Sequence, residues 1–368
     1  QGGAGIGYFF LRLYERTGDP SWREAAEELA RWLRLLSLDP HGDGLTLVVP
    51  EAAGAEQLQT GLADGNAGVA FFLLNVASVE RTDAALAAAS GLVGEASLLS
   101  EEAGFNQALA EGMVAYLLSD DVVRSELTGL SWPSRLSLSI GGTNSGTNSS
   151  TDSTRGPTGV LAGQAGIGWA LLQASQAGVT GALAGAEGSA RWLSHALNAH
   201  YYQGRTWWPE QPQGWQDSSS ASDGNVTGVE LTQTGGPITW RYLPGLEEGM
   251  AGIAWFMRDL SRETGAACWE KLSDEAAHWL YLRGRPSGQE ELWRWPQEAT
   301  RQRGEDLWVG HFSPTLAHGT SGVTRFLAYD RLSDLDTPSS DLPSFWGLRP
   351  VEGVTQSPLT CEGARELP

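Results

Sequence analysis

One short glycine pattern occurs five times along the chain, four times as GxAG and once as the variant GTSG, and it constrains the fold more than any other feature of the sequence. The copies are GGAG at 2–5, GNAG at 65–68, GQAG at 163–166, GMAG at 249–252 and GTSG at 319–322. Each copy opens a segment of helical length, such as IGYFFLRLYERTG after the first. These segments are apolar on nearly all sides in their first turns, so they are expected to be buried helices.

A tryptophan or tyrosine lies at a nearly constant distance after four of the copies, inside a second helical pattern that is amphipathic. The separation is 26 or 27 residues in three units and 48 in the second, which indicates an insertion of about twenty residues around 82–103. In the first unit, Asp19 and Pro20 provide an N-cap and a first helical residue. The spacing predicts equivalent, largely buried positions on outer helices for Trp32, Trp192 and Trp279.

An extended segment that contains proline follows 17 or 18 residues later, at Val49-Pro50, Trp132-Pro133, Trp208-Pro209 and Trp295-Pro296. Each unit therefore consists of an inner helix, an outer helix and an extended segment that leads to the next glycine turn. Such hairpins cannot close a core singly, so they stack as a solenoid or close into a ring. We expect the ring, an all-α fold in which an α/α toroid (barrel) of repeated helical hairpins carries the GxAG turns at one end.

The toroid is expected to form one domain over 1–335, followed by a Pro-rich tail over 336–368. Two segments rich in Ser, Thr and Gly, at 139–159 and 216–228, interrupt the repeat and are expected to be flexible loops. The chain begins at Gln1, inside a copy of the motif, which suggests a fragment or an excised domain.

The chain has 24 basic and 44 acidic side chains, and its net charge of −20 repels phosphate backbones and anionic lipid surfaces. We therefore expect neither nucleic acid nor membrane partners, whereas a cationic peptide would be attracted. The longest apolar runs are shorter than the roughly 20 residues that span a bilayer. Only Cys268 and Cys361 are present, which excludes a disulfide framework and suggests a reducing cytoplasm.

The residue before the first glycine of each turn is the best candidate for chemistry, because the turns would meet at one end of the toroid. Asp64, Glu248 and His318 occupy this position in three units, and they are predicted to share acid and base roles in one cavity. The alternative is that each of them caps its own helix. The free N–H groups of the first helical turns would favour an anion or an enolate oxygen. Substrate contacts are predicted for Glu247, Gly65, Gly249 and Gly319.

The strings GLADGNAGV, GLEEGMAGIAW and LRLYERTGD resemble the repeat of the lanthionine synthetase C-like family, and the likeness runs from residue 2 to about 330 outside the polar loops. The resemblance implies a toroid that adds a peptide cysteine thiol to dehydroalanine or dehydrobutyrine and so closes a thioether ring. It also implies a Ser/Thr/Cys-rich precursor peptide and a fused or partner kinase or lyase domain. In that family a histidine in an Ala-His-Gly turn acts as a general acid or base, which matches His318 in LAHG.

The resemblance further implies a central zinc ion held by cysteine-bearing turns, and here the sequence departs from the family. Two residues before the glycine stand Glu247 and Ala317, and neither provides a thiolate. We therefore expect no zinc and no other cofactor. Two explanations remain open: the chain resembles the zinc-free cyclase-like domains of kinase-type lanthipeptide synthetases, or the metal-bearing turns lie beyond residue 368.

Two other functions remain open. The first is a carbohydrate-active α/α-toroid enzyme, a glycosidase or an epimerase, in which Asp64 and Glu248 are paired carboxylates. Its sugar platform would consist of Trp207, Trp208 and Trp215. The second is a peptide-binding scaffold without catalytic activity. Tryptophans packed between helices would count against the carbohydrate function.

Overall fold

A computed structural model of the chain divides into two compact units. The first consists of residues 1–156 and 161–189, and the second of residues 157–160 and 190–368. The structure describes residues 2–39, 48–49, 57–120, 122–126, 129–133, 135–137, 158–199, 240–242, 244–247, 249–286, 293–295, 299–302, 305–307, 315 and 319–332. The two predicted polar loops and the tail over 336–368 lie almost entirely outside these residues.

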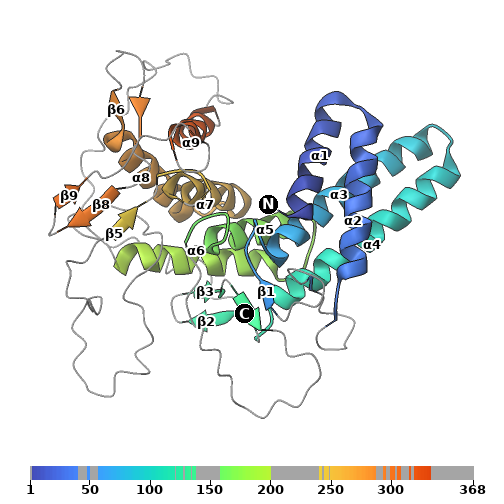
Figure 1. Ribbon diagram of the computed structural model, residues 1–368, viewed down its shortest axis with the longest axis horizontal. Coiled ribbons are helices and arrows are strands. Elements are labelled where there is room, and N and C mark those ends of the chain that lie inside the picture. Colours follow the sequence, from blue (N-terminus) through green and yellow to red (C-terminus); the bar gives the residue numbers. More distant parts are fainter. Residues whose placement is uncertain are drawn as a thin grey trace, which may run out of the picture. The chain divides into compact units, whose positions relative to one another are not determined.

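The described residues are mainly helical, and successive helices pair as antiparallel hairpins (Figure 1). The prediction of an all-α class built from repeated helical hairpins, with a GxAG turn before each inner helix, is confirmed. The inner helices are α1 (Gly3–Thr17), α3 (Asn66–Ala89), α5 (Gln164–Gln176), α7 (Met250–Thr264) and α9 (Thr320–Leu332). The outer helices are α2 (Pro20–Leu36), α4 (Val93–Leu117), α6 (Ala182–Ala199) and α8 (Ala267–Arg283).

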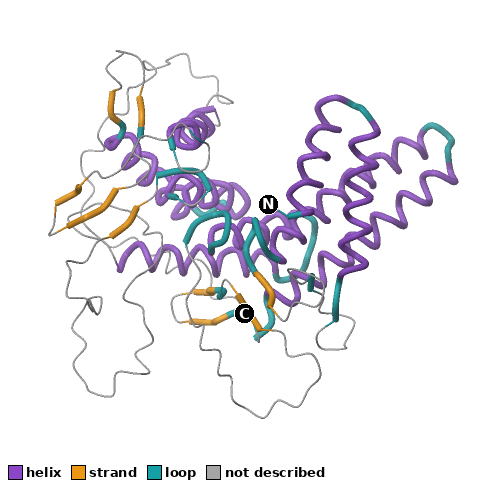
Figure 2. Tube along the Cα trace, in the orientation of Figure 1, coloured by secondary structure: helices purple, strands orange, loops and turns teal. Residues whose placement is uncertain are grey.

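Short antiparallel strands lie in the extended segments between the hairpins, and no described strand is longer than four residues (Figure 2). In the first unit β1 (Gln57–Gln59) pairs with β4 (Arg135–Ser137), and β2 (Arg124–Glu126) pairs with β3 (Gly129–Ser131). In the second unit β8 (Ala299–Gln302) lies between β5 (Trp240–Tyr242) and β9 (Glu305–Leu307), and β6 (Arg285–Pro286) pairs with β7 (Trp293–Arg294).

The predicted start of the first outer helix is confirmed in detail. The Asp19 carboxylate accepts a hydrogen bond from the Ser21 N–H at 3.0 Å, and Pro20 is the first helical residue. Just before it, Gly18 closes α1 in the left-handed conformation with φ of 69°. Gly265 closes α7 with the same φ, so the sequence TG ends two inner helices in the same way.

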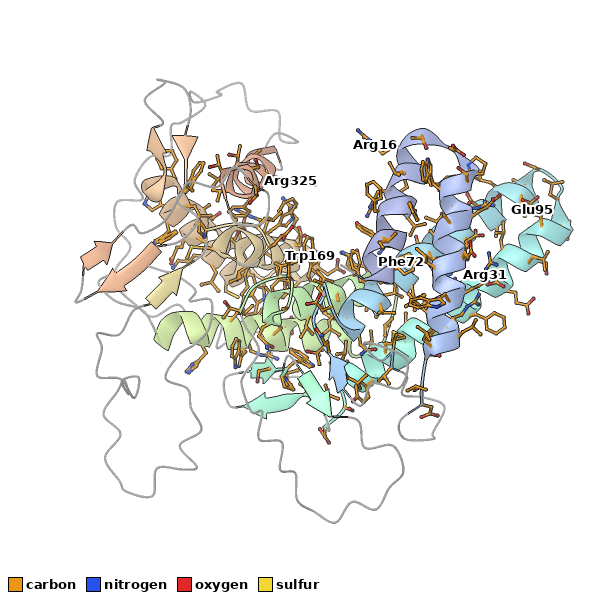
Figure 3. All side chains as sticks on the ribbon, viewed as in Figure 1. Arg16, Arg31, Phe72, Glu95, Trp169 and Arg325 are labelled. Carbon is orange, nitrogen blue, oxygen red and sulfur yellow. The ribbon has the colours of Figure 1, made fainter. Side chains whose placement is uncertain are left out.

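Three inner helices are buried as predicted, but α1 is not. Phe72 in α3 and Phe256 in α7 are fully buried, whereas Phe9, the equivalent residue in α1, is 58% exposed. Ile6 is also exposed. The reason is that α1 packs against α2 and α3, and these two side chains lie on its remaining side. The ring of Phe72 instead packs on Gly7, where a Cβ atom would lie 2.3 Å from it (Figure 3).

The prediction of buried outer-helix tryptophans holds in two of three cases. Trp192 and Trp279 are almost completely buried. Trp32 is 49% exposed, so the prediction was wrong at this position. One edge of its ring lies against Gly3 of α1, but the rest faces out, because Trp32 belongs to the same first hairpin whose outer side is uncovered.

The predicted insertion around 82–103 lengthens the second hairpin. Helices α3 and α4 contain 24 and 25 residues, whereas the other described helices contain 13 to 18. The extra turns expose Leu86, Leu92, Val93 and Leu98.

None of the described helices combines the length and the apolar character that crossing a bilayer requires.

Candidate functional site

The glycine turn that precedes α3 folds back tightly over the start of its own helix. The N–H groups of Gly65 and Gly68 both donate to the Gly61 carbonyl, at 3.0 and 3.3 Å. A Cβ atom on Gly68 would lie 1.8 Å from the Leu62 carbonyl oxygen, and one on Gly65 would lie 2.4 Å from the Gln59 carbonyl oxygen. These glycines are therefore required by the close approach of backbone, and not by a positive φ.

The turn before α7 repeats this geometry in the second unit. A Cβ atom on Gly252 would lie 1.9 Å from the carbonyl oxygen of Leu246, which is the repeat equivalent of Leu62. The Ala251 N–H donates to the Pro244 carbonyl at 3.2 Å, as the Ala67 N–H donates to the Thr60 carbonyl at the same distance. The repeated sequence GLxxGxAG thus gives one backbone structure twice.

The hydrogen bonds within the turns change one prediction. The N–H groups at the start of the inner helices were expected to be free to bind an anion. Those of Ala67 and Gly68 instead donate to the carbonyls of Thr60 and Gly61. Because the turn itself supplies these acceptors, the start of α3 does not offer those two N–H groups to a substrate oxygen. The chemistry of the site therefore depends on side chains.

A polar residue at the second position of GxAG binds the extended segment of the preceding unit, a role that the sequence analysis did not predict. Gln164 bonds both backbone groups of Trp132, and Asn66 bonds both backbone groups of Val49. The Trp295 N–H donates to the Thr320 hydroxyl at 3.3 Å. We call Asn66, Gln164 and Thr320 the turn clamps. Their sequence signal is a polar side chain at a fixed position in an otherwise apolar helix start.

The tryptophans of the extended segments are structural. The indole N–H of Trp132 donates to the Leu117 carbonyl at 2.6 Å, and that of Trp295 donates to the Leu280 carbonyl at the same distance. Both side chains are buried. Trp208 is their repeat equivalent, but it lies outside the described residues with Trp207 and Trp215. Buried equivalents count against a sugar platform at Trp208.

Backbone hydrogen bonds link the segments that form the turns. In the first unit the Ala63 N–H donates to the Leu161 carbonyl at 2.7 Å, between equivalent residues of two successive turns. In the second unit the Val160 N–H donates to the Glu247 carbonyl at 2.8 Å. The turns before α3 and α5 therefore lie side by side in the first unit, as expected if the turns gather at one end of the hairpins.

The structure places only part of the predicted site. Asp64 is exposed and makes no hydrogen bond or ion pair within the described part of the chain, while Gly65 beside it is buried. The N-cap of α3 is Gly65 and has no side-chain cap, so Asp64 does not cap its helix as the alternative proposed. In the other unit Glu247 is half-buried, and Gly249 and Gly319 are buried. Glu248 and His318 lie outside the described residues.

Asp64 and Glu247 belong to different units, so their convergence on one cavity stays a prediction.

The residues at the positions where the lanthionine synthetase C-like family holds zinc cannot form a thiolate zinc site. Glu247 and Ala317 occupy the ligand positions, and Cys268 in α8 is disulfide-bonded. Among the described residues, no three His, Cys, Asp or Glu side chains gather as metal ligands.

A buried carboxylate outside the turns was also missed by the sequence analysis. Glu80 in α3 is 2% exposed, and both its carboxylate oxygens accept from the Asn106 side-chain amide, at 2.9 and 3.1 Å. Burial raises the pKa of Glu80 to about 7. Its sequence signal is weak, because a single glutamate in an apolar helix is usually assigned to a solvent-facing side.

Comparison with models of known protein families gives no match, and comparison with curated proteins gives none either. Among solved structures, the chain is similar to the crystal structure of a D-mannose isomerase, with a TM-score of 0.46 and 13% sequence identity. The similarity covers 77% of this chain and 60% of the isomerase chain, so the protein spans less than two thirds of that neighbour.

Proposed function

We propose that the chain is a lanthionine synthetase C-like domain that binds a dehydrated peptide and closes a thioether ring in it. The observation that carries the proposal is the turn GLxxGxAG, whose close backbone packing recurs at Gly68 and Gly252. The same string carries the resemblance to that family. The packing explains why the string recurs unchanged at its glycines, and it leaves the residue before the first glycine free to vary in chemistry.

The reaction is an addition in which all atoms are conserved. The peptide thiol loses its proton, the sulfur forms a bond to Cβ of dehydroalanine or dehydrobutyrine, and the electron pair of the C=C bond moves toward the neighbouring carbonyl. The resulting enolate accepts a proton at Cα. The site must therefore provide one base and one acid near the same peptide, and no redox partner is needed.

Three side chains provide these groups in our proposal. His318 transfers a proton to or from the reacting thiol or the enolate, because an imidazole titrates near neutral pH. Asp64 and Glu248 act as the partner carboxylates. The exposure of Asp64, and its lack of a hydrogen bond or ion pair to the described residues, support this role. Glu247, Gly65, Gly249 and Gly319 line the turns that position the peptide.

The partner we propose is a cationic, Ser/Thr/Cys-rich precursor peptide, together with a fused or partner kinase or lyase domain. The net charge of −20 supports a cationic peptide, because it raises the local concentration of positive ligands. No step of this mechanism uses zinc, since the residues at the ligand positions do not fit it.

A thiol-alkylation assay tests the proposal. The protein is incubated with a lysine-bearing peptide that contains one dehydroalanine and one cysteine, and the remaining thiol is then alkylated. Ring closure leaves the peptide mass unchanged and protects it from alkylation, so a growing unalkylated fraction is expected. A fraction that grows no faster than in buffer alone contradicts the proposal.

A further inference from the structure

One position of the repeat carries ring-bearing side chains on four inner helices and an arginine on the fifth. It is the third residue after the last glycine of each turn. The residues are Tyr8, Phe71, Trp169, Trp255 and Arg325. The first four are all half-buried, although direct neighbours on the same helices, such as Ala170 and Phe256, are buried. We call these four residues the aromatic row, a name for their shared repeat position, with Tyr8, Phe71 and Trp169 in the first unit and Trp255 in the second.

Residues at this position meet between consecutive inner helices. In the first unit the rings of Tyr8 and Phe71 pack edge to face, with centroids 5.0 Å apart. In the second unit the guanidinium of Arg325 on α9 lies over the ring of Trp255 on α7, 5.7 Å from its centroid. Figure 3 labels Trp169 on α5 and Arg325 on α9. The same repeat position thus forms a ring–ring contact in one unit and a cation–ring contact in the other.

The chain's own arginines show what these rings attract. The guanidinium of Arg12 lies 4.7 Å from the centroid of the Tyr8 ring, and its Nε donates to the Tyr8 hydroxyl at 2.8 Å. The side chain of Arg12 is 47% exposed, and Arg325 is exposed too. Because exposed arginines rest on Tyr8 and Trp255, those ring faces can be reached from solvent. The negative face of an aromatic ring favours a cation there.

We propose that, in each unit by itself, the rings of the aromatic row bind the lysine and arginine side chains of a peptide through cation–π contacts. The proposal deepens the proposed function, on which it rests for the choice of a peptide as ligand. The net charge of −20 attracts a cationic chain over long distances, and the rings select it at short range. Arg325 occupies the place of a ligand cation on Trp255 in the absence of a peptide.

Peptide binding to single variants tests the proposal. The probes are a lysine-bearing peptide and the same peptide with every lysine acetylated, which removes the charge and keeps the length. Trp169→Leu and Trp255→Leu should each raise the Kd for the charged peptide by about 3- to 30-fold. Neither should change the weak binding of the acetylated form. Trp32→Leu is the matched control, because Trp32 is an exposed tryptophan of an outer helix outside the row, and it should bind as the wild type does.

An arginine variant should instead strengthen peptide binding, a result that a misfolded protein cannot produce. Arg325→Gln uncovers the ring of Trp255 and should lower the Kd for the charged peptide by about threefold. Arg262→Gln removes the same charge from α7, where Arg262 pairs with Asp259 at 3.4 Å, and should leave the Kd nearly unchanged. Equal effects of the two arginine variants would show a general charge effect and overturn the proposal.

The outcomes separate this proposal from the proposed function. If the protein forms no thioether but the tryptophan variants still weaken binding of the charged peptide only, the function is wrong and the aromatic row stands. If thioether forms and both tryptophan variants bind the two peptides as the wild type does, the aromatic row is wrong. Equal losses for the charged and acetylated peptides also overturn it, because they would indicate apolar packing.

Discussion

Gln164 holds both backbone polar groups of Trp132. The Trp132 N–H donates to Gln164 Oε1 at 2.9 Å, and Gln164 Nε2 donates to the Trp132 carbonyl at 2.7 Å. Both residues are buried, so the two backbone groups have no access to water. The contact joins the start of one hairpin to the extended segment that follows the previous one, and Asn66 makes the same contact with Val49.

Replacing Gln164 with Leu should therefore destabilise the protein strongly. The change leaves a buried N–H and a buried carbonyl without partners, which costs about 2–5 kcal/mol of unfolding free energy. Urea unfolding measures it. The control is Gln173→Leu on the same helix, where the side-chain amide donates to the exposed Gln176 and to no other described residue. The loss there should stay below about 0.5 kcal/mol. Equal losses in the two variants would refute the structural role of the clamp.

Adding one methyl group to a turn glycine should prevent normal folding. A Cβ atom on Gly68 would lie 1.8 Å from a backbone carbonyl oxygen, which cannot move without breaking the turn. Gly68→Ala should lose more than about 3 kcal/mol of stability or fail to give soluble protein. Gly94→Ala, near the start of α4, meets no atom within 4 Å and should be neutral or stabilise by up to about 1 kcal/mol. Thermal unfolding of both proteins makes the comparison.

Two phenylalanines at equivalent repeat positions should respond very differently to truncation. Phe72→Ala removes a fully buried ring that packs on Gly7, and should cost about 3–5 kcal/mol. Phe9→Ala removes a ring that is 58% exposed and should cost less than about 1 kcal/mol. Chemical denaturation distinguishes them. A large loss for Phe9→Ala would show that α1 is covered in solution, and would contradict its exposed side.

Glu80 should make stability depend on pH. Its pKa is raised by burial from 4.5 to about 7, so between these values the folded protein binds a proton that the unfolded chain has lost. Stability should therefore fall as pH rises from about 4.5 to 7 and level off above, by up to roughly 3 kcal/mol. The nearby Glu27 and Glu102 add to the shift, and Arg34 opposes it.

Replacing Glu80 with Gln should remove this fall, and should stabilise the protein at pH 8 relative to the wild type. The neutral amide carries no buried charge and can donate to the side-chain oxygen of Asn106, which has no hydrogen-bond partner among the described residues. Unfolding curves at pH 5 and pH 8 provide the measurement. Glu101→Gln, at an exposed position on α4, serves as the control. A pH dependence that persists unchanged in Glu80→Gln would mean that another group titrates.

The sequence predicted those features of the fold that follow from its periodicity, namely the helical hairpins and two buried tryptophans. The spacing of the GxAG copies located the hairpins, and the constant offset located Trp192 and Trp279 in buried positions. It failed at Trp32, because burial there depends on a neighbouring hairpin and not on the helix itself. The turn clamps and the internal acceptors for the Ala67 and Gly68 N–H groups were missed for a similar reason. Both contacts arise from backbone that returns over the helix start, and helical periodicity does not describe such backbone.

The candidate site was predicted only in outline. Asp64 lies at an exposed position in its turn, as a functional carboxylate requires, and it does not cap α3. His318 lies outside the described residues, so its catalytic role rests on its place before Gly319 and on the family resemblance. A histidine between a turn and a helix start has no periodicity that reveals its direction, which is why a rate measurement is needed.

The most direct test is the rate of thioether formation by His318→Asn compared with that of the wild type, on a dehydrated, cysteine-bearing cationic peptide. General acid–base catalysis contributes a factor of about 100 or more, so the variant should close the ring at least about 100-fold more slowly. Its helical circular dichroism and its Kd for the peptide should stay unchanged. Ring closure at the wild-type rate in this variant would contradict the account.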